Sequence, residues 1–119
     1  MKRIILVFIL VVLADSARLE AHAFLKDAEP SVGSTVQTSP NEVRIRFTEN
    51  IEPALSSIQI LDASGKAVDK RDVHLDRSDQ KLLHVSLPPL ETGIYKVVWR
   101  VVSTDTHVTN GNFTFRVVR

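Results

Sequence analysis

The sequence predicts an all-β domain, a Greek-key β-barrel or β-sandwich of about seven strands. Apolar and polar residues alternate with a period of two through most of the chain after residue 22. Glycine and proline separate the alternating runs, as expected of turns. Beyond the amino-terminal region, no stretch of ten or more residues has the helical period of 3.6. Many short strands joined by turns are typical of sandwiches and small barrels.

Alternation identifies the strands one by one. Five runs alternate clearly and are expected to be strands: 42–49, 56–61, 81–87, 95–102 and 112–118. In the first run Val43, Ile45 and Phe47 share the face that we expect to be buried. The segment 28–37 alternates poorly, and we expect an irregular connection or a short edge strand there.

Turn residues lie between these runs. Glycine, which accepts a positive φ, occurs in 63–66 and 91–93, and proline interrupts 39–41 and 87–90. The chain has no cysteine, so no disulfide can pin the two sides of the core. We therefore expect Trp99 and the phenylalanines to fill it.

The amino-terminal region predicts export. Two basic residues precede an unbroken apolar run of eleven residues at 4–14, which is shorter than the roughly 20 residues that span a bilayer. This arrangement is typical of a secretory signal peptide. Cleavage after Ala21 would leave His22 first, whereas cleavage after Ala23 would leave Phe24 first. We expect a signal peptide at 1–21 and one domain at 22–119, with the choice of cleavage site left open.

Composition excludes several classes of function. The formal net charge is +1 with acids and bases interleaved, which argues against a nucleic-acid partner. No second apolar run follows the first, so we expect no membrane span after signal cleavage, and we expect a monomer. Ser103, Asp105 and His107 lie on one short segment and cannot form a hydrolase relay. The sequence therefore predicts no enzyme.

Four histidines are candidates for metal binding. His74 lies in a charged stretch and His84 on the polar side of a strand, and we interpret both as solvent-exposed. Asp105 and His107 differ, because residues two apart on an extended segment project from the same side and could meet one ion. Taken alone, the pair is more commonly a hydrogen-bonded surface pair than a metal site.

Three long stretches together resemble the copper-resistance protein C (CopC) family of periplasmic copper-binding proteins. They are HAFLKDAEPSVGS (22–34), RIRFTENIEPALSSIQILDASGKAV (44–68) and GIYKVVWRVVSTDTHVTNGNFTFRV (93–117). The last is similar to the family ending G-x-Y-x-V-x-W-x-V-x-S-x-D-x-H, followed by G-x-x-x-F-x-V. The resemblance covers nearly all of 22–119. It implies an immunoglobulin-like or cupredoxin-like outline, a periplasmic location and Cu(II) bound at one end.

The resemblance also implies a ligand set for one Cu(II) per chain: His22, Asp105, His107 and Glu49. A freed His22 offers its terminal amine and an imidazole nitrogen. With His107 and Asp105 these make three nitrogens and one oxygen, a donor set that suits Cu(II). Glu49, from F-T-E, is equally well explained as an outward charge or as an acceptor for the terminal amine.

The chain departs from some relatives in its methionines. Met1 is the only methionine and would be lost with the signal peptide, so we expect no Cu(I) site built from thioethers. The resemblance implies a copper carrier or buffer for resistance or homeostasis, which could deliver copper to a CopD-type inner-membrane transporter. Two alternatives stay open. One is a metal-free immunoglobulin-like interaction module, and the other is a copper monooxygenase-like enzyme, against which the low aromatic content of 6% counts.

Overall fold

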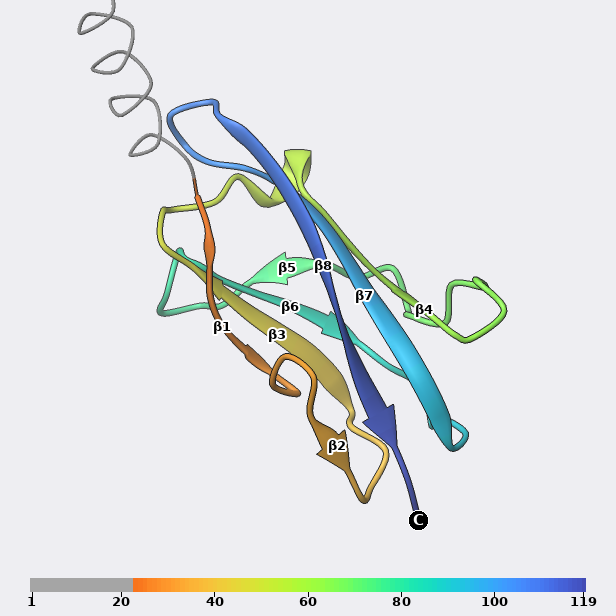
Figure 1. The fold of residues 1–119 in the computed structure, drawn as a ribbon. Helices are drawn as coiled ribbons and strands as arrows, with labels where there is room; N and C mark the ends of the chain where they lie inside the picture. Colours follow the sequence, from red (N-terminus) through yellow and green to blue (C-terminus); the bar gives the residue numbers. More distant parts are fainter. Residues whose placement is uncertain (1–22) are drawn as a thin grey trace, which may run out of the picture.

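The computed structural model describes residues 23–119, which form two four-stranded sheets packed face to face (Figure 1). One sheet has the order β1 (Leu25–Glu29), β3 (Glu42–Phe47), β6 (Leu82–Ser86), β5 (His74–Leu75). The other has the order β2 (Thr35–Val36), β8 (Val108–Val117), β7 (Gly93–Val102), β4 (Ser57–Leu61). A 3₁₀ turn, η1 (Pro53–Leu55), precedes β4. The predicted signal peptide at 1–21 lies outside the described residues.

This architecture confirms the prediction of an all-β fold and identifies it as a two-sheet sandwich. Neighbouring strands are antiparallel except β2, which runs parallel to β8. The described residues contain eight strands, and alternation does not reveal three of them: β1, which has five residues, and β2 and β5, which have two residues each. Within residues 23–119, no helix is long and apolar enough to cross a membrane.

The core is filled from the inward faces of both sheets, as the alternation predicts. The Phe47 and Trp99 rings meet edge to face with centroids 5.1 Å apart, and those of Tyr95 and Phe115 stack at 5.6 Å. Such aromatic pairs add stability beyond the apolar area that they bury. Trp99 and three phenylalanines thus lie in the core of this cysteine-free sandwich, as expected, but Phe24 is exposed and most of the core is aliphatic.

Gly111 lies within β8, one residue before the run 112–118 that alternation identifies as a strand. β8 begins at Val108, so Gly111 pairs directly with Trp99 on β7. A Cβ atom at this position would lie 2.5 Å from the Cζ2 atom of Trp99. The absence of a side chain therefore lets the indole ring lie flat across β8.

Candidate metal centre

A tight turn joins β7 to β8 and carries Asp105 and His107. The amide of Thr106 donates to the Ser103 carbonyl at 2.8 Å, and the amide of Ser103 donates to the His107 carbonyl at 3.0 Å. Thr106 adopts a φ of 73°. The expectation of an extended segment here was therefore wrong, because the chain reverses direction between the two candidate ligands.

The turn nevertheless brings the two side chains together. Nδ1 of His107 lies 3.3 Å from Oδ2 of Asp105. About half of each side chain is exposed, 53% for Asp105 and 43% for His107. A carboxylate and an imidazole therefore lie together at a partly exposed position, although Nδ1 of His107 is itself covered.

Ser103 orients the Asp105 carboxylate through a hydrogen bond. Ser103 is only 1% exposed, and its hydroxyl donates a hydrogen bond to Oδ1 of Asp105. This bond, together with the weaker effect of His107, lowers the pKa of the Asp105 carboxyl from its ordinary value of 3.8. Asp105 is consequently ionised at neutral pH and oriented before any ion arrives.

The first described residues are fixed beside the same turn. The Thr109 hydroxyl donates to the carbonyl oxygen of Ala23 at 2.7 Å, and Ala23 is fully buried. Next along the chain, Phe24 and Thr48 exchange two hydrogen bonds of 2.9 Å. Figure 1 shows β1 leading away from the loop between β7 and β8. Ala23 is thus bonded to β8 at Thr109, two positions beyond His107.

The other two predicted ligands are His22 and Glu49. His22 lies outside the described residues. Glu49 is exposed, and it lies between Thr48, which bonds Phe24, and Asn50, whose carbonyl accepts from the Thr104 amide at 2.9 Å. Within residues 23–119, no three His, Asp or Glu side chains are gathered closely enough to hold an ion. In the structure, the side chains of Asp105 and His107 therefore lie close together, and Glu49 is on a neighbouring segment.

Sequence reasoning missed two residues of this region. Ser103 was considered only as a nucleophile, although a serine hydroxyl can also donate a hydrogen bond to a nearby carboxylate. Thr109 was not considered at all. Its partner, Ala23, is 86 residues away in the chain, so no local pattern could have identified the contact.

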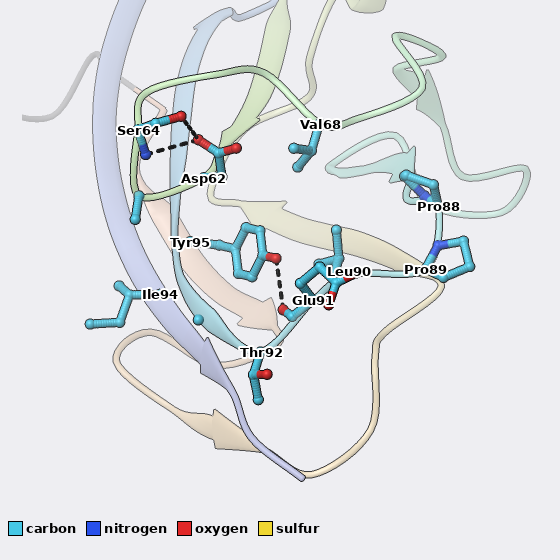
Figure 2. Close-up of a pocket in the computed structure, with 12 residues that line it drawn as sticks. Asp62, Ser64, Val68, Pro88, Pro89, Leu90, Glu91, Thr92, Ile94 and Tyr95 are labelled. Carbon is cyan, nitrogen blue, oxygen red and sulfur yellow. Dashed lines mark hydrogen bonds between the residues drawn. The ribbon is translucent and has the colours of Figure 1, made fainter.

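A cleft near the opposite end of β7 does not resemble a metal site. It has a volume of about 430 Å³ and is lined largely by apolar and backbone groups around Val68, Leu90 and Tyr95 (Figure 2). The Tyr95 hydroxyl donates to the Glu91 carbonyl at 2.7 Å, and burial raises the pKa of that hydroxyl. No histidine is among the twelve lining residues. We therefore place the candidate metal centre at the turn between β7 and β8.

Comparisons with known proteins identify the family of the chain. The model of the CopC domain matches residues 25–118. The crystal structure of CopC from Methylosinus trichosporium OB3b is similar, with 40% identity, a TM-score of 0.77 and coverage of 82% of this chain and 94% of that one.

Two further relatives are similar over most of their length. The crystal structure of PcoC, a methionine-rich copper resistance protein from Escherichia coli, matches with 34% identity, a TM-score of 0.72 and coverage of 82% and 99%. Protein YobA of Escherichia coli K12 is 34% identical over 98 residues, which is 82% of this chain and 79% of that protein. The family model spans the two sheets and the turn that joins β7 to β8, and the chain belongs to the CopC family of copper resistance proteins.

Proposed function

We propose that the chain is an exported copper carrier or buffer that holds one Cu(II) between its mature amino terminus and the turn after β7. The ligands would be the terminal amine and imidazole of His22, an imidazole nitrogen of His107 and the Asp105 carboxylate. Three nitrogens and one oxygen suit the tetragonal preference of Cu(II). Glu49 lies on a neighbouring segment and would bind either the ion or the terminal amine.

The anchoring of Ala23 by Thr109 is the observation that carries this proposal. The Cα atom of the preceding residue is about 3.8 Å from that of Ala23. Thr109 is two positions beyond His107, which is about 7 Å along a strand. A histidine at position 22 would therefore begin within side-chain reach of His107 and Asp105.

The burial of Ala23 favours cleavage after Ala21. Ala23 belongs to the buried core and accepts the hydrogen bond from Thr109. Cleavage after Ala23 would remove this core residue and, with it, the proposed amine and imidazole ligands. Cleavage after Ala21 keeps both and leaves His22 as the first residue.

The choice of Cu(II) over Cu(I) rests on the donor types. Nitrogen and carboxylate ligands suit the oxidised ion, whereas Cu(I) prefers soft thiolate or thioether sulfur. No cysteine and no methionine follows residue 1. PcoC, by contrast, is described as methionine-rich.

Two measurements test the proposal. The mass of the exported protein reads the cleavage site directly. Titration of residues 22–119 with Cu(II), followed by electron paramagnetic resonance, should show one tightly bound ion with several nitrogen ligands. Binding unchanged in His107→Ala would refute the proposed site, and no tight binding at all would favour a metal-free interaction module.

Membership of a family of copper resistance proteins agrees with the prediction that the chain is not an enzyme. Periplasmic location and delivery to a CopD-type membrane transporter are part of the proposal. Fractionation of cells that produce the full-length chain tests the location. Copper uptake in cells with and without the transporter tests the delivery.

A further inference from the structure

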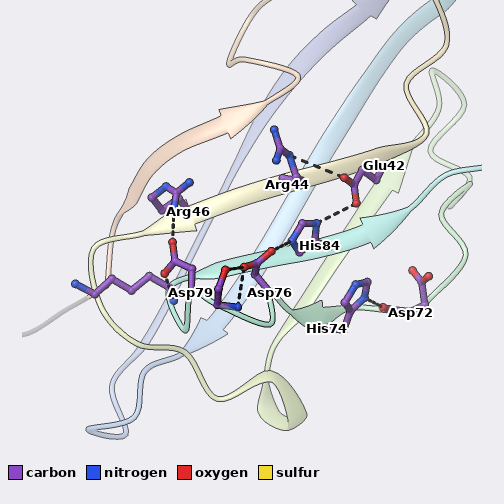
Figure 3. Close-up of polar contacts among 10 residues, drawn as sticks. Glu42, Arg44, Arg46, Asp72, His74, Asp76, Asp79 and His84 are labelled. Carbon is purple, nitrogen blue, oxygen red and sulfur yellow. Dashed lines mark hydrogen bonds and ion pairs between the residues drawn. The ribbon is translucent and has the colours of Figure 1, made fainter.

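A second group of polar side chains lies on the outer face of the other sheet, away from the turn after β7. His74 on β5 and His84 on β6 are directly opposite each other in the antiparallel register. Their rings stack with centroids 5.3 Å apart and an interplanar angle of 11° (Figure 3). Two imidazoles are therefore held side by side on adjacent strands.

His84 is not the solvent-exposed side chain that the sequence predicted. Only 12% of it is exposed, since carboxylates cover both ring nitrogens. Nδ1 lies 2.9 Å from Oε1 of Glu42, and Nε2 lies 2.9 Å from Oδ1 of Asp76. A neutral imidazole carries one N–H, so it can donate to only one of these carboxylates. A second proton or a cation must therefore lie between the ring and the other carboxylate.

The partners of the two rings determine which nitrogen is available. Nδ1 of His74 lies 2.7 Å from the backbone carbonyl oxygen of Asp72. A carbonyl oxygen only accepts, so this nitrogen carries the hydrogen and Nε2 of neutral His74 keeps its lone pair. Figure 3 shows that Glu42 contacts Nδ1 of His84 in the same way, and that Nε2 of His84 points toward Asp76. A histidine whose other N–H is held by a carbonyl or carboxylate is the usual form of a metal ligand.

We propose that this cluster binds one Zn(II) ion through Nε2 of His74, Nε2 of His84 and the carboxylate of Asp76. The ion would replace the proton between His84 and Asp76. Imidazole and carboxylate are ligands that Zn(II) accepts. This site shares no residue with the proposed Cu(II) site and does not depend on it.

The distance between His84 and Asp76 agrees with two of the three ligands being close to their binding positions. Two donors that each lie about 2.1 Å from an ion, at an angle near 90°, are about 3.0 Å apart. The separation of 2.9 Å between His84 and Asp76 meets this requirement. The third ligand has to move, because among residues 23–119 no three such groups already surround one point. His74 is exposed, so its side chain can leave the Asp72 carbonyl and move toward the ion.

The surrounding charges favour a cation. The hydrogen bond from His84 and those from Ser78 lower the pKa of Asp76 to about 2, so the carboxylate is ionised at neutral pH. Glu42 adds a second negative charge against His84, which is partly balanced by Arg44, 3.9 Å from Glu42 and directly opposite His84 in the register. Glu42 would thus orient the ring from behind the metal ligand, a role whose loss typically costs about 10- to 100-fold in metal affinity.

The test uses residues 22–119 carrying His107→Ala, in which the turn after β7 has lost its imidazole. Titration with zinc sulfate, measured by calorimetry, should show one bound Zn(II). Nitrogen-15 spectra should show the Nε2 signals of His74 and His84 shifting together. Adding His74→Ala or Asp76→Asn should abolish this binding, and adding Glu42→Ala should weaken it by about 10- to 100-fold.

Glu29→Gln, which removes an exposed carboxylate from β1 of the same sheet, is the matched control and should leave zinc binding unchanged. His74→Ala is the decisive variant because the side chain is exposed and its loss should spare the fold, as circular dichroism would verify. Zinc binding that survives His74→Ala, or that is absent from the His107→Ala protein, would overturn this inference. Neither result would affect the proposed Cu(II) site, whose own test is the loss of copper in His107→Ala.

Discussion

The Thr109 hydroxyl donates a hydrogen bond of 2.7 Å to the carbonyl oxygen of Ala23, which joins two residues 86 positions apart in the chain. The bond connects Ala23, the first residue that the structure describes, to β8, the strand that follows His107. Because Ala23 is also buried in the core, two different interactions fix the same residue. This anchor is the basis of the proposed copper site, and it can be tested directly.

Thr109→Val should weaken both the fold and copper binding. The variant keeps the size of the side chain and removes the donor, so the unfolding free energy should fall by about 1 kcal/mol. Cu(II) affinity should fall as well, since the amino terminus is no longer held beside the turn. Urea denaturation and Cu(II) titration measure the two effects. Thr114→Val, on an exposed position of the same strand, is the control and should change neither.

Ser103→Ala should lower Cu(II) affinity without removing a ligand. The hydroxyl that orients Asp105 would be lost, so the carboxylate could point away from His107. Ser103→Thr keeps a hydroxyl and should restore much of the affinity. A competition titration with a copper chelator compares the three proteins. Equal affinities in the alanine variant and the parent would show that the turn orients Asp105 without this bond.

Gly111→Ala should destabilise the sandwich. The new methyl group would press on the Trp99 ring at 2.5 Å, so the ring or the strand must shift. Overpacking of this kind typically costs about 1–3 kcal/mol. Thermal denaturation followed by the fluorescence of Trp99, the single tryptophan, measures the loss. Asn112→Ala, at the exposed neighbouring position, should have little effect.

Asp62 should make stability depend on pH in the acid range. Hydrogen bonds from Ser64 and Lys66 lower the pKa of its carboxyl below 3.8 in the folded protein (Figure 2 shows those from Ser64). A carboxyl with a lowered folded pKa stabilises the fold fully above its unfolded pKa, near 3.9. That contribution is lost as the pH falls through the folded value.

Comparison of Asp62 with its neutral isostere measures this effect. The difference in unfolding free energy between the parent and Asp62→Asn should be constant above about pH 5 and should shrink toward pH 2. Urea denaturation of the metal-free proteins at several pH values gives the difference. A gap that stays constant down to pH 2 would mean that the charge of Asp62 contributes nothing.

Local pattern was sufficient to predict the long strands, because their alternation reflects one buried and one exposed face. It failed where pairing with a neighbour decides the structure. The first residues of β8 read as a turn by composition, but pairing of Val108 with Val102 makes them part of the ladder. β5 has two residues and exists only because it pairs with His84 and Leu83 of β6.

The same distinction holds for the candidate sites. The motif identified Asp105 and His107 because they are neighbours in the chain. The partners of His84 were hidden from sequence reasoning, since Glu42 is 42 residues away and Asp76 is brought close by the turn between β5 and β6. A histidine on the polar side of a strand can face water or a carboxylate, and only the packing of the neighbouring strands decides between them.

The burial of Ala23 has a consequence for processing. Ala23 is fixed in the core, so its position does not depend on where the mature chain begins. If the mature chain began one residue earlier or later than His22, its terminal amine would lie about 3.3 Å away from the proposed position, which is the rise of one residue along a strand. That displacement exceeds the length of a bond between a metal ion and a nitrogen, about 2 Å. On the proposed ligand set, the fidelity of the signal peptidase would therefore set the copper affinity of every molecule that leaves the cytoplasm.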